Sequence, residues 1–597
     1  MTSTQRYIAP ARWRRLARSA ALTFGLLTAA PALAAQPCTI EGALAAAPTG
    51  LTVAPINDLN PHLPAVPTGV LMVPATGRTP AYCLVTGSVV TNPTTGKTAN
   101  FALALPSSWK NKLLFSGCAG YCGVVFQSPP DDARGGGFPP DALARGYAIV
   151  ATDAGHVSNP VGFVLDGSWA LTAPGAANEA AVADFFYRAV HMVADRSKQF
   201  LRSWYSASLA RAYFYGCSDG GREGMVEATR YPADFDGYVV GAPSFDVPGQ
   251  ILAGRAAKAL LKSERSFIPT ELLTLVDRAV YASCDAADGV KDGLIQNPGR
   301  CPFDPNSLLC SDDYSRDCLT QDQVDTLASW LSAATDQQGR VVSYGFPVSD
   351  IYNARVPGNN LYQWTEAAGP PLDIKASDPW GPDESKQAPG WAFYDQSFRY
   401  LVFRDPNRDI NNDSPVDGRG EVDDADLALL EARTEAGRGD DPRQLAPFLT
   451  STRKLIMFHG YSDGFINPFR TVRFYEDWAT LAGGYDRLQQ SARLFMVPGM
   501  YHCSRGPGPN VFDALGALEQ WVENGVEPER IVATKYENDD RAQRALRKMP
   551  LCIFPKRARY AGHGDVNSAA NWSCPANEDL LQVGPNGARA GLDMPAR

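Results

Sequence analysis

Residues 212–224 read AYFYGCSDGGREG, and this stretch decides the fold. Its first four residues form a short apolar and aromatic run, which is typical of a buried strand. The pentapeptide GCSDG at 216–220 matches the G-x-S-x-G pattern, in which a strand turns sharply into a helix and exposes a serine hydroxyl. The pattern needs glycines because side chains at the flanking positions would collide in the turn. A helix over 222–230 and a strand over 238–240 complete a predicted βαβ unit.

Other short apolar runs repeat this arrangement along the chain. Each ends near Gly, Asp or His, is followed by a loop and then by helical periodicity, and so predicts parallel strands joined by crossover helices. The runs are KLLF at 112–115, YAIVAT at 147–152, KLIMF at 454–458 and RLFMV at 493–497. The region 248–449 instead has helical pieces, acidic loops and few strand patterns. We therefore predict an α/β fold whose core is interrupted by an insertion at 248–449 and resumes at 450.

The first 34 residues predict a secretory signal peptide that is cleaved from the mature protein. They contain five Arg and no acidic residue, then an apolar run over 20–30, then the small-residue sequence ALA at 32–34. The run is too short for a membrane anchor. Arg14-Arg15 leaves both the general and the twin-arginine export routes open. We expect a secreted or periplasmic protein.

Charge and cysteine content agree with export. Without residues 1–34 the chain has 50 basic and 64 acidic residues, a net charge of −14, which disfavours nucleic acid and anionic lipid as partners. A small neutral or weakly charged substrate is the expected partner. The twelve cysteines form an even set that indicates disulfides in an oxidising compartment.

A nucleophilic serine needs a general base, and the chain has six histidines, at 62, 156, 191, 459, 502 and 563. In the chain order Ser, acid, His, the base comes last. His502 follows the run at 493–497 and meets that requirement, whereas His459 and His156 come too early in the chain. Asp463, in the loop after the run at 454–458, is the predicted acid that orients the base. The alternative for Asp463 is an ordinary Asp-Gly turn residue.

The neighbours of the predicted nucleophile and base support each other. Cys217 directly precedes Ser218, and Cys503 directly follows His502. If the serine and the histidine meet, their neighbouring cysteines come within bonding distance. A disulfide there would join segments 286 residues apart in the sequence.

These motifs resemble those of the tannase and feruloyl esterase family, which is marked by a disulfide between the neighbours of Ser and His and includes mono(2-hydroxyethyl) terephthalate hydrolases. The resemblance covers nearly the whole mature chain. It implies an α/β-hydrolase core in two parts, 35–247 and 450–597, with a lid domain at 248–449. The matching segments are GCSDGGREG at 216–224, YSDG at 461–464, PGMYHC at 498–503, TDAGH at 152–156, YPADFDGYVVGAP at 231–243, SFRYLVF at 397–403 and ARYAGHGDVN at 558–567.

The resemblance implies a serine esterase for aromatic carboxylic esters. Among these we favour feruloyl esters over galloyl or terephthaloyl esters. Two other classes of function remain open for the same motifs. One is an acyltransferase that uses the same triad, and the other is a non-catalytic, calcium-stabilised binding protein.

An oxyanion hole requires two backbone donors. The N–H of Asp219, the residue after the nucleophile, is the first. The second is expected in the loop after 112–115, with Cys118 as the predicted donor. This loop departs from the glycine-rich loop of the family by carrying Cys118 and Cys122, which a local disulfide would join.

The segment CDAADGVKDGL at 284–294 predicts a calcium site. Asp285, Asp288 and Asp292 bring three carboxylates into eight residues, and hard oxygen ligands in a flexible extracellular loop suit Ca²⁺. The resemblance adds the carbonyls of Val290 and Leu294 as ligands. Calcium would be structural because the segment lies in the predicted lid and contains no nucleophile or base. The alternative is a solvated acidic loop, and no organic cofactor is expected.

Sequence spacing alone leaves the connectivity of the other cysteines open. The family resemblance implies the pairs Cys38–Cys83, Cys284–Cys301, Cys310–Cys318 and Cys552–Cys574.

Overall fold

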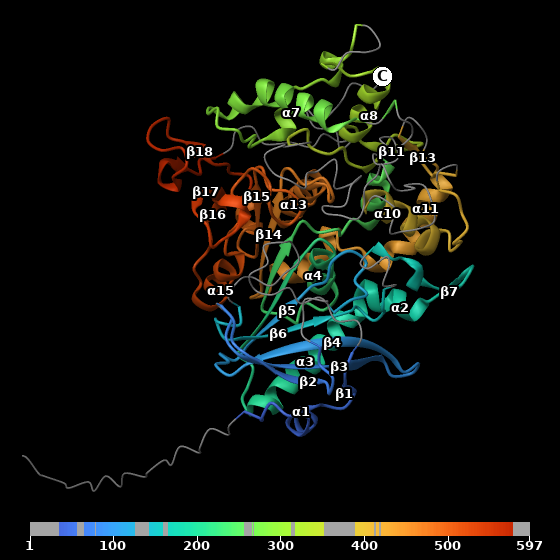
Figure 1. Ribbon diagram of the computed structural model, residues 1–597, viewed down its shortest axis with the longest axis vertical. Coiled ribbons are helices and arrows are strands. Elements are labelled where there is room, and N and C mark those ends of the chain that lie inside the picture. Colours follow the sequence, from blue (N-terminus) through green and yellow to red (C-terminus); the bar gives the residue numbers. More distant parts are fainter. Residues whose placement is uncertain are drawn as a thin grey trace, which may run out of the picture.

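The computed structural model describes residues 35–56, 65–77, 79–125, 142–158, 165–255, 265–266, 268–311, 317–350, 389–410, 413–416 and 420–576. The predicted signal peptide, residues 1–34, lies outside these residues. Across the described residues a ten-stranded mixed sheet forms the centre of the molecule (Figure 1), in the order β1-β3-β4-β6-β5-β9-β10-β14-β15, with β2 paired to β3. Its strands are β1 (Leu51–Val53), β2 (Val70–Val73), β3 (Tyr82–Asn92), β4 (Lys97–Pro106), β5 (Lys112–Ser116), β6 (Tyr147–Thr152), β9 (Arg211–Cys217), β10 (Gly237–Gly241), β14 (Lys454–Gly460) and β15 (Ala492–Val497).

The strands predicted from apolar runs, β6, β5, β9, β10, β14 and β15, are confirmed, and each is parallel to its neighbours among these six. Their side chains alternate between two hydrophobic clusters. In β14, Leu455 and Met457 belong to the cluster on one face, and Ile456 and Phe458 to the cluster on the other. Burial on both faces explains why these strands are continuous apolar runs rather than alternating ones.

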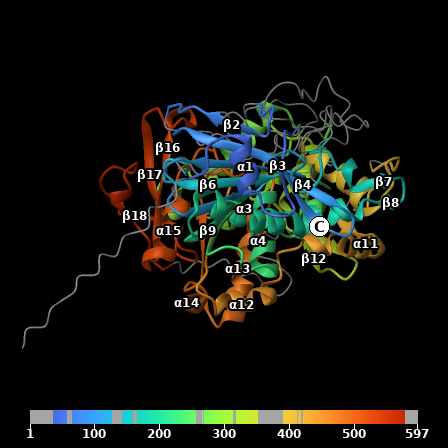
Figure 2. The ribbon, with the colours of Figure 1, turned by 90° about the horizontal axis from the view of Figure 1, so that it is seen from below.

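Helices cover both faces of the sheet. α3, α4 and α13 pack their apolar residues into one cluster, and α15 packs into the other. Figure 2 shows α3, α4 and α13 one under another from the centre of the picture downward, with β16 and β17 at its upper left. The helices are α1 (Ile40–Ala46), α2 (Glu179–Ala183), α3 (Ala189–Tyr205), α4 (Asp219–Arg230), α5 (Val247–Ala253), α7 (Thr270–Cys284), α8 (Gln321–Leu331), α10 (Pro389–Gln396), α11 (Asp424–Thr434), α12 (Ala446–Leu449), α13 (Pro468–Ala482), α14 (Tyr485–Leu488) and α15 (Ala514–Asn524).

The sheet also contains strands for which we made no prediction. β1 to β4 pair in an antiparallel manner at one end of the sheet, and β4 joins β6 antiparallel. The central sheet is therefore mixed rather than wholly parallel. The smaller sheets use β7 (Leu171–Ala173), β8 (Ala176–Ala177), β11 (Ala334–Asp336), β12 (Val341–Ser343), β13 (Glu421–Val422), β16 (Arg530–Tyr536), β17 (Ala545–Cys552), β18 (Arg559–Tyr560) and β19 (Trp572–Ser573).

The chain between β10 and β14 builds a hydrophobic cluster of its own. This cluster runs from Ile251 to Leu430 and includes buried side chains of α5, α7, α8 and α11. The sheet β12-β11-β13 belongs to the same segment. Figure 1 shows α7 and α8 at the end of the molecule opposite α1 and α3. The segment matches the predicted insertion, while the boundaries 35–247, 248–449 and 450–597 stay predictions.

Six disulfides cross-link the described chain, over sequence separations from 4 to 286 residues. All twelve cysteines are paired, so the predicted pairing is confirmed. The bonds are Cys38–Cys83, Cys118–Cys122, Cys217–Cys503, Cys284–Cys301, Cys310–Cys318 and Cys552–Cys574. In the part of the chain that the structure describes, no helix has both the length and the apolar character to cross a lipid bilayer.

The aromatic packing beneath β9 gives a test of the core. Phe214 is fully buried, with its ring centre 5.7 Å from that of Phe115 and 5.5 Å from that of Phe235. Phe214→Ala should lower the free energy of unfolding by about 3–5 kcal/mol because it removes buried surface and leaves a cavity. Leu481→Ala, at a side chain that is 58% exposed, is the control and should change it by less than about 0.5 kcal/mol. Denaturant unfolding measures both, and equal losses would contradict this account of the core.

Candidate active site

Ser218 lies at the reversal between β9 and α4. Its backbone has φ 65° and ψ −126°, a conformation that L-residues seldom adopt outside strained turns. The reversal brings backbones very close together. A Cβ on Gly216 would lie 2.2 Å from the carbonyl oxygen of Gly220, and a Cβ on Gly220 would lie 2.8 Å from the carbonyl oxygen of Cys118. The glycines of the G-x-S-x-G pattern are therefore required by contact, as predicted.

His502 meets Ser218 from the loop that follows β15. Its Nε2 lies 2.9 Å from Ser218 Oγ, and its Nδ1 lies 2.8 Å from Asp463 Oδ2. A carboxylate only accepts hydrogen bonds, so the proton of a neutral imidazole is on Nδ1 and Nε2 accepts from the serine hydroxyl. The structure thus joins the three predicted residues in a single hydrogen-bonded chain.

Asp463 lies in the loop after β14 and is buried, with 1% of its surface exposed. Its Oδ1 accepts from the backbone N–H groups of Phe465 at 2.8 Å and Ile466 at 3.0 Å. Burial alone would raise the pKa of Asp463, but the charge of His502 and the hydrogen bonds of His459 and His502 lower it below its usual range. The carboxyl group is therefore an anion throughout the pH range of ordinary esterase assays.

The Cys217–Cys503 disulfide lies directly beside this chain of hydrogen bonds. The two Cα atoms are 6.0 Å apart, although 286 residues separate them in sequence. One cysteine ends β9 before Ser218, and the other follows His502. The bond therefore holds the serine and the histidine loops together, as the sequence predicted.

His459, at the end of β14, is a second histidine on the same carboxylate. Its Nε2 lies 3.2 Å from Asp463 Oδ2, and the side chain is fully buried. His459 precedes Asp463 in the chain and was therefore not the predicted base; in the structure it contacts Asp463, whereas His502 contacts Ser218. The spacing His459-x-x-x-Asp463 was the available indication of its contact with the acid.

The loop after β5 contacts α4, the helix that begins directly after Ser218. The N–H of Cys118 donates to Glu223 Oε2 at 2.9 Å. This N–H is available to a substrate oxygen only if that bond is given up, so Cys118 as an oxyanion donor stays a prediction. Burial and the nearby charge of Asp219 raise the pKa of Glu223 to about 8, although Arg222 opposes this shift. Asp219 itself is held by Arg222, whose Nε donates to its Oδ1 at 2.6 Å.

A chain of aromatic side chains packs beside His502. The ring of Phe465 stacks on the imidazole at a centre-to-centre distance of 5.4 Å. Phe393, from the segment between β10 and β14, lies edge-on to Phe465 at 6.4 Å and packs against Tyr121 at 5.0 Å. The core and the inserted segment therefore share an aromatic surface beside the imidazole.

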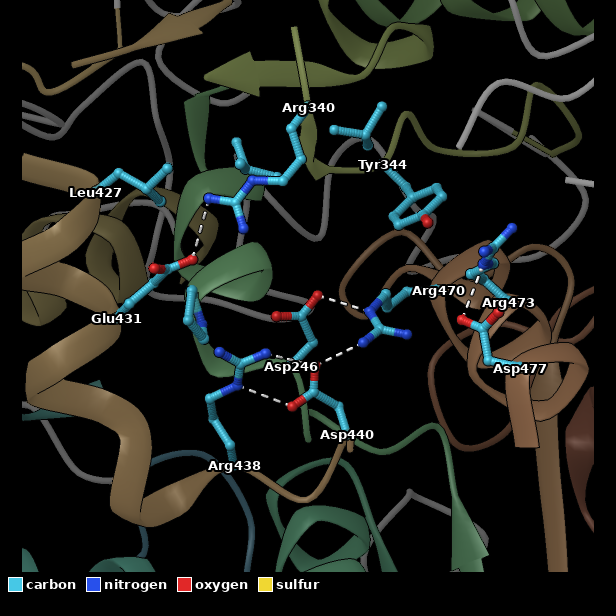
Figure 3. A pocket seen from close by; sticks show the side chains of 13 residues that line it. Asp246, Arg340, Tyr344, Leu427, Glu431, Arg438, Asp440, Arg470, Arg473 and Asp477 are labelled. Atoms are coloured by element: carbon cyan, nitrogen blue, oxygen red, sulfur yellow. Dashed lines mark hydrogen bonds and ion pairs between the residues drawn. The ribbon is translucent and has the colours of Figure 1, made fainter. Parts of the chain in front are cut away.

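A polar cavity of about 180 Å³ lies where the inserted segment meets α13 (Figure 3). Its charged residues are paired with one another. Arg470 Nε donates to Asp246 at 2.8 Å, and Arg438 Nε donates to Asp440 at 2.9 Å. Figure 3 shows Arg340 and Tyr344 on the opposite side of the cavity from these pairs. The cavity thus lies at the boundary between the core and the inserted segment, and the charged side chains that line it form ion pairs.

The predicted calcium segment forms a tight wrap. Asp285 Oδ1 accepts from the N–H of Gly293 at 3.0 Å, and Asp292 forms an ion pair with Arg547. Asp288 Oδ2 is buried without a hydrogen-bond partner. Burial and the charges of Asp292 and Asp285 raise the pKa of Asp288 to about 6, against the effect of the N–H of Val290. Carboxylate oxygens suit a hard cation, and calcium at this segment stays a prediction.

Among the described residues, two groups of potential metal ligands converge, and neither includes the carboxylates of the predicted calcium segment. They are Cys118, Cys122, Asp219 and Glu223 in one group, and His191, Glu227 and Asp234 in the other. In the first group both sulfurs belong to a disulfide. In the second, the ammonium of Lys198 already lies 3.4 Å from Asp234. Neither group therefore resembles a free metal site.

The chain is similar to known esterases along most of its length. The chain is 31% identical over 491 residues to an uncharacterised esterase of Xanthomonas campestris pv. campestris, with coverage of 76% of this chain and 79% of the relative. It is 30% identical over 532 residues to a mono(2-hydroxyethyl) terephthalate hydrolase of Piscinibacter sakaiensis, covering 79% and 81%. It is also 30% identical over 481 residues to a probable feruloyl esterase of Arthroderma benhamiae, covering 79% and 81%.

Solved structures share the fold. The crystal structure of feruloyl esterase B from Aspergillus oryzae matches with a TM-score of 0.69 and 25% identity, covering 88% of this chain and 97% of that one. The tannin acyl hydrolase from Aspergillus niger matches with a TM-score of 0.65 and 22% identity, covering 91% and 97%. The central sheet is thus of the α/β-hydrolase type. A profile described as tannase and feruloyl esterase matches residues 83–575. The chain therefore belongs to the tannase and feruloyl esterase family and is a carboxylic ester hydrolase.

Proposed function

We propose that the protein is a secreted serine esterase that hydrolyses aromatic carboxylic esters, feruloyl esters foremost, with Ser218 as nucleophile, His502 as general base and Asp463 as the orienting acid. The observation that carries the proposal is the chain of hydrogen bonds from Ser218 Oγ through His502 to Asp463 Oδ2, at 2.9 and 2.8 Å. A nucleophile, a base and an orienting carboxylate within hydrogen-bond distance are what acyl transfer through a serine requires.

The first half of the reaction forms an acyl-enzyme. His502 Nε2 takes the hydroxyl proton while Ser218 Oγ attacks the ester carbonyl carbon, and Asp463 stabilises the resulting imidazolium. Backbone N–H groups stabilise the tetrahedral oxyanion, and the N–H of Asp219 is the first of them. The bond to the alcohol oxygen then breaks, and His502 gives its proton to the departing alcohol.

The second half releases the acid. His502 takes a proton from water while the water oxygen attacks the acyl-enzyme carbonyl. The bond to Ser218 Oγ breaks, and the serine recovers its proton from His502. One ester and one water thus give one carboxylic acid and one alcohol, and the enzyme returns to its starting state.

The aromatic surface beside the imidazole supports an aromatic acyl group as substrate. Phe465 stacks on His502 and Phe393 packs on Phe465, and aromatic pairs gain about 0.5–1.5 kcal/mol beyond the burial of their surface. Because Phe393 comes from the inserted segment, we propose that this segment acts as a lid that contributes to substrate choice. Relatives named for feruloyl esters and for mono(2-hydroxyethyl) terephthalate support the same class of substrate.

Secretion is part of the proposal. The sequence pattern of residues 1–34 is that of a cleaved signal peptide. The disulfides of the described chain are bonds that persist in oxidising compartments.

Substrate choice and the nucleophile are tested together. Methyl ferulate, methyl gallate and mono(2-hydroxyethyl) terephthalate are assayed side by side by the release of free acid, and methyl ferulate should give the highest kcat/KM. Ser218→Ala should reduce kcat by about 10⁴-fold or more on every substrate, with unchanged thermal unfolding, because only the attacking oxygen is lost. Wild-type rates in Ser218→Ala would refute the mechanism.

The active-site disulfide should support both stability and rate. The double variant Cys217→Ser/Cys503→Ser should lose about 2–5 kcal/mol of unfolding free energy, because the cross-link restricts the unfolded chain. It should also lose kcat, because the serine and histidine loops are no longer tied together. The matched control is Cys310→Ser/Cys318→Ser, whose bond spans 8 residues in the inserted segment and should leave kcat unchanged. Equal kcat in both double variants would contradict the positioning role.

We propose that Asp285, Asp288, Asp292 and the carbonyls of Val290 and Leu294 hold a structural Ca²⁺. The buried, unpartnered Oδ2 of Asp288 supports this proposal. A bound calcium ion would neutralise the three carboxylates and stabilise the wrap, without a part in the chemistry of the ester.

Removing calcium should therefore lower stability before it lowers activity. A chelator should lower Tm by several degrees, and Ca²⁺ but not Mg²⁺ should restore it, since the smaller ion demands a stricter geometry. Asp288→Asn should abolish the effect of the chelator. Asp413→Asn, at an acidic side chain elsewhere in the inserted segment, should retain it. A Tm that does not respond to chelator or to added Ca²⁺ would argue against the site.

A further inference from the structure

His459 is surrounded by three polar contacts although it is fully buried. Its Nε2 lies 3.2 Å from Asp463 Oδ2 and 3.1 Å from the carbonyl oxygen of Ile466. On the other side of the ring, Nδ1 lies 2.8 Å from Thr471 Oγ1 on α13. The imidazole therefore bridges the loop after β14, which contains Asp463, and α13, which follows that loop.

The partners of His459 determine where its proton lies. Both groups at Nε2, a carboxylate and a carbonyl, only accept hydrogen bonds, so Nε2 carries the proton and shares it between them. The Nδ1 atom then accepts from the hydroxyl of Thr471. A neutral ring satisfies every contact, and a full positive charge without water would be costly at this depth.

Asp463 Oδ2 thus receives two imidazole donors. His502 Nδ1 is at 2.8 Å and His459 Nε2 is at 3.2 Å, while Oδ1 is held by the N–H groups of Phe465 and Ile466. Removing His459 would leave Oδ2 with His502 as its remaining hydrogen-bond donor among these four groups. The carboxylate would be freer to rotate, and its charge would act more strongly on the base.

We propose that His459 is a positioning residue for the reaction, which fixes the carboxylate of Asp463 and moderates its pull on His502. The proposal rests on the proposed function, since it assigns His459 a role in the same catalytic chain. It acts through Asp463 and touches neither Ser218 nor the substrate. The ionisable groups that face Asp463 are His502 and His459, and the adjacent Ser462 donates to Asp350 at 2.5 Å.

Two polar substitutions of His459 distinguish the contact at Nε2, with Asp463, from the contact at Nδ1, with Thr471. Gln places an amide N–H near the former Nε2 position, so His459→Gln keeps a donor for Asp463. Asn is shorter and reaches only the Thr471 side, so His459→Asn loses that donor. A purely structural histidine predicts that activity follows the folded fraction in both variants.

In His459→Asn, kcat should fall about 10- to 100-fold with little change in KM, because the base is misplaced rather than the substrate. The acid limb of kcat/KM against pH, which reports protonation of the catalytic base, should move upward by about 0.5–1 pH unit. That shift corresponds to the loss of one hydrogen bond that competes for the carboxylate. His459→Gln should keep the wild-type acid limb.

The control is another histidine bonded to an aspartate. His191 Nδ1 lies 2.6 Å from Asp234 on the surface side of α3, away from the triad. His191→Gln should leave the acid limb unchanged. An acid limb that moves equally in His459→Asn and His459→Gln, or in neither, overturns the proposal.

If His459→Asn does not fold, Thr471→Val tests the proposal instead. It removes the hydroxyl that hydrogen-bonds to His459 Nδ1 and keeps the volume of the side chain. A smaller upward shift of the acid limb supports the proposal, and an unchanged limb overturns it. Each pH profile is also measured as the rate of inactivation by a sulfonyl fluoride, which reacts with the activated serine without any ester substrate. Failure of Ser218-dependent sulfonylation in the wild type would instead refute the proposed function.

Discussion

Burying the carboxylate of Asp463 removes it from water, so the surrounding chain must supply the hydrogen bonds that water would have made. Two backbone N–H groups hold Oδ1, and two imidazoles hold Oδ2. Because all four donors come from the loop itself, from β14 and from the loop after β15, satisfying this one anion fixes three segments together. The position of His502, and with it the hydrogen bond from His502 to Ser218, depends on that arrangement.

The strained reversal at Ser218 needs equally firm support. Positive φ at a serine is costly, and it persists only where the surroundings enforce it. Close backbone contacts at Gly216 and Gly220 hold the backbone of Ser218 in this conformation. The Cys217–Cys503 bond ties the residue before Ser218 to the loop that carries His502. The nucleophile and its base are thus held by covalent and steric constraints rather than by side-chain hydrogen bonds alone.

The sequence was most informative where a single requirement, such as burial on both faces of a strand, determined the order of apolar and polar residues. The six central strands are apolar on both faces, and their runs were visible, whereas β3 and β4 mix Thr, Ser, Gly and Asn with apolar residues and lead into a turn rather than a helix. Ser218 was predicted from the G-x-S-x-G pattern, and Asp463 and His502 from their order in the chain; the structure joins the three by hydrogen bonds. The contact of His459 with the acid was not predicted, because chain order says nothing about a second imidazole on the same carboxylate. The bond from Cys118 to Glu223 depends on how α4 faces the loop after β5, which no local pattern encodes.

The place of the insertion follows from how the sheet is paired. β10 and β14 are neighbours, with Gly237 opposite Lys454, so the chain can leave one strand and return to the next without disturbing the lateral pairing. The inserted segment then contacts the acid loop directly. Asn467 donates to the carbonyl of Gly345 at 2.8 Å, and Gln250 donates to the carbonyl of Phe465 at 2.7 Å. Phe465 in turn stacks on His502. The loop after β14 therefore connects the inserted segment to the histidine that we propose as the general base.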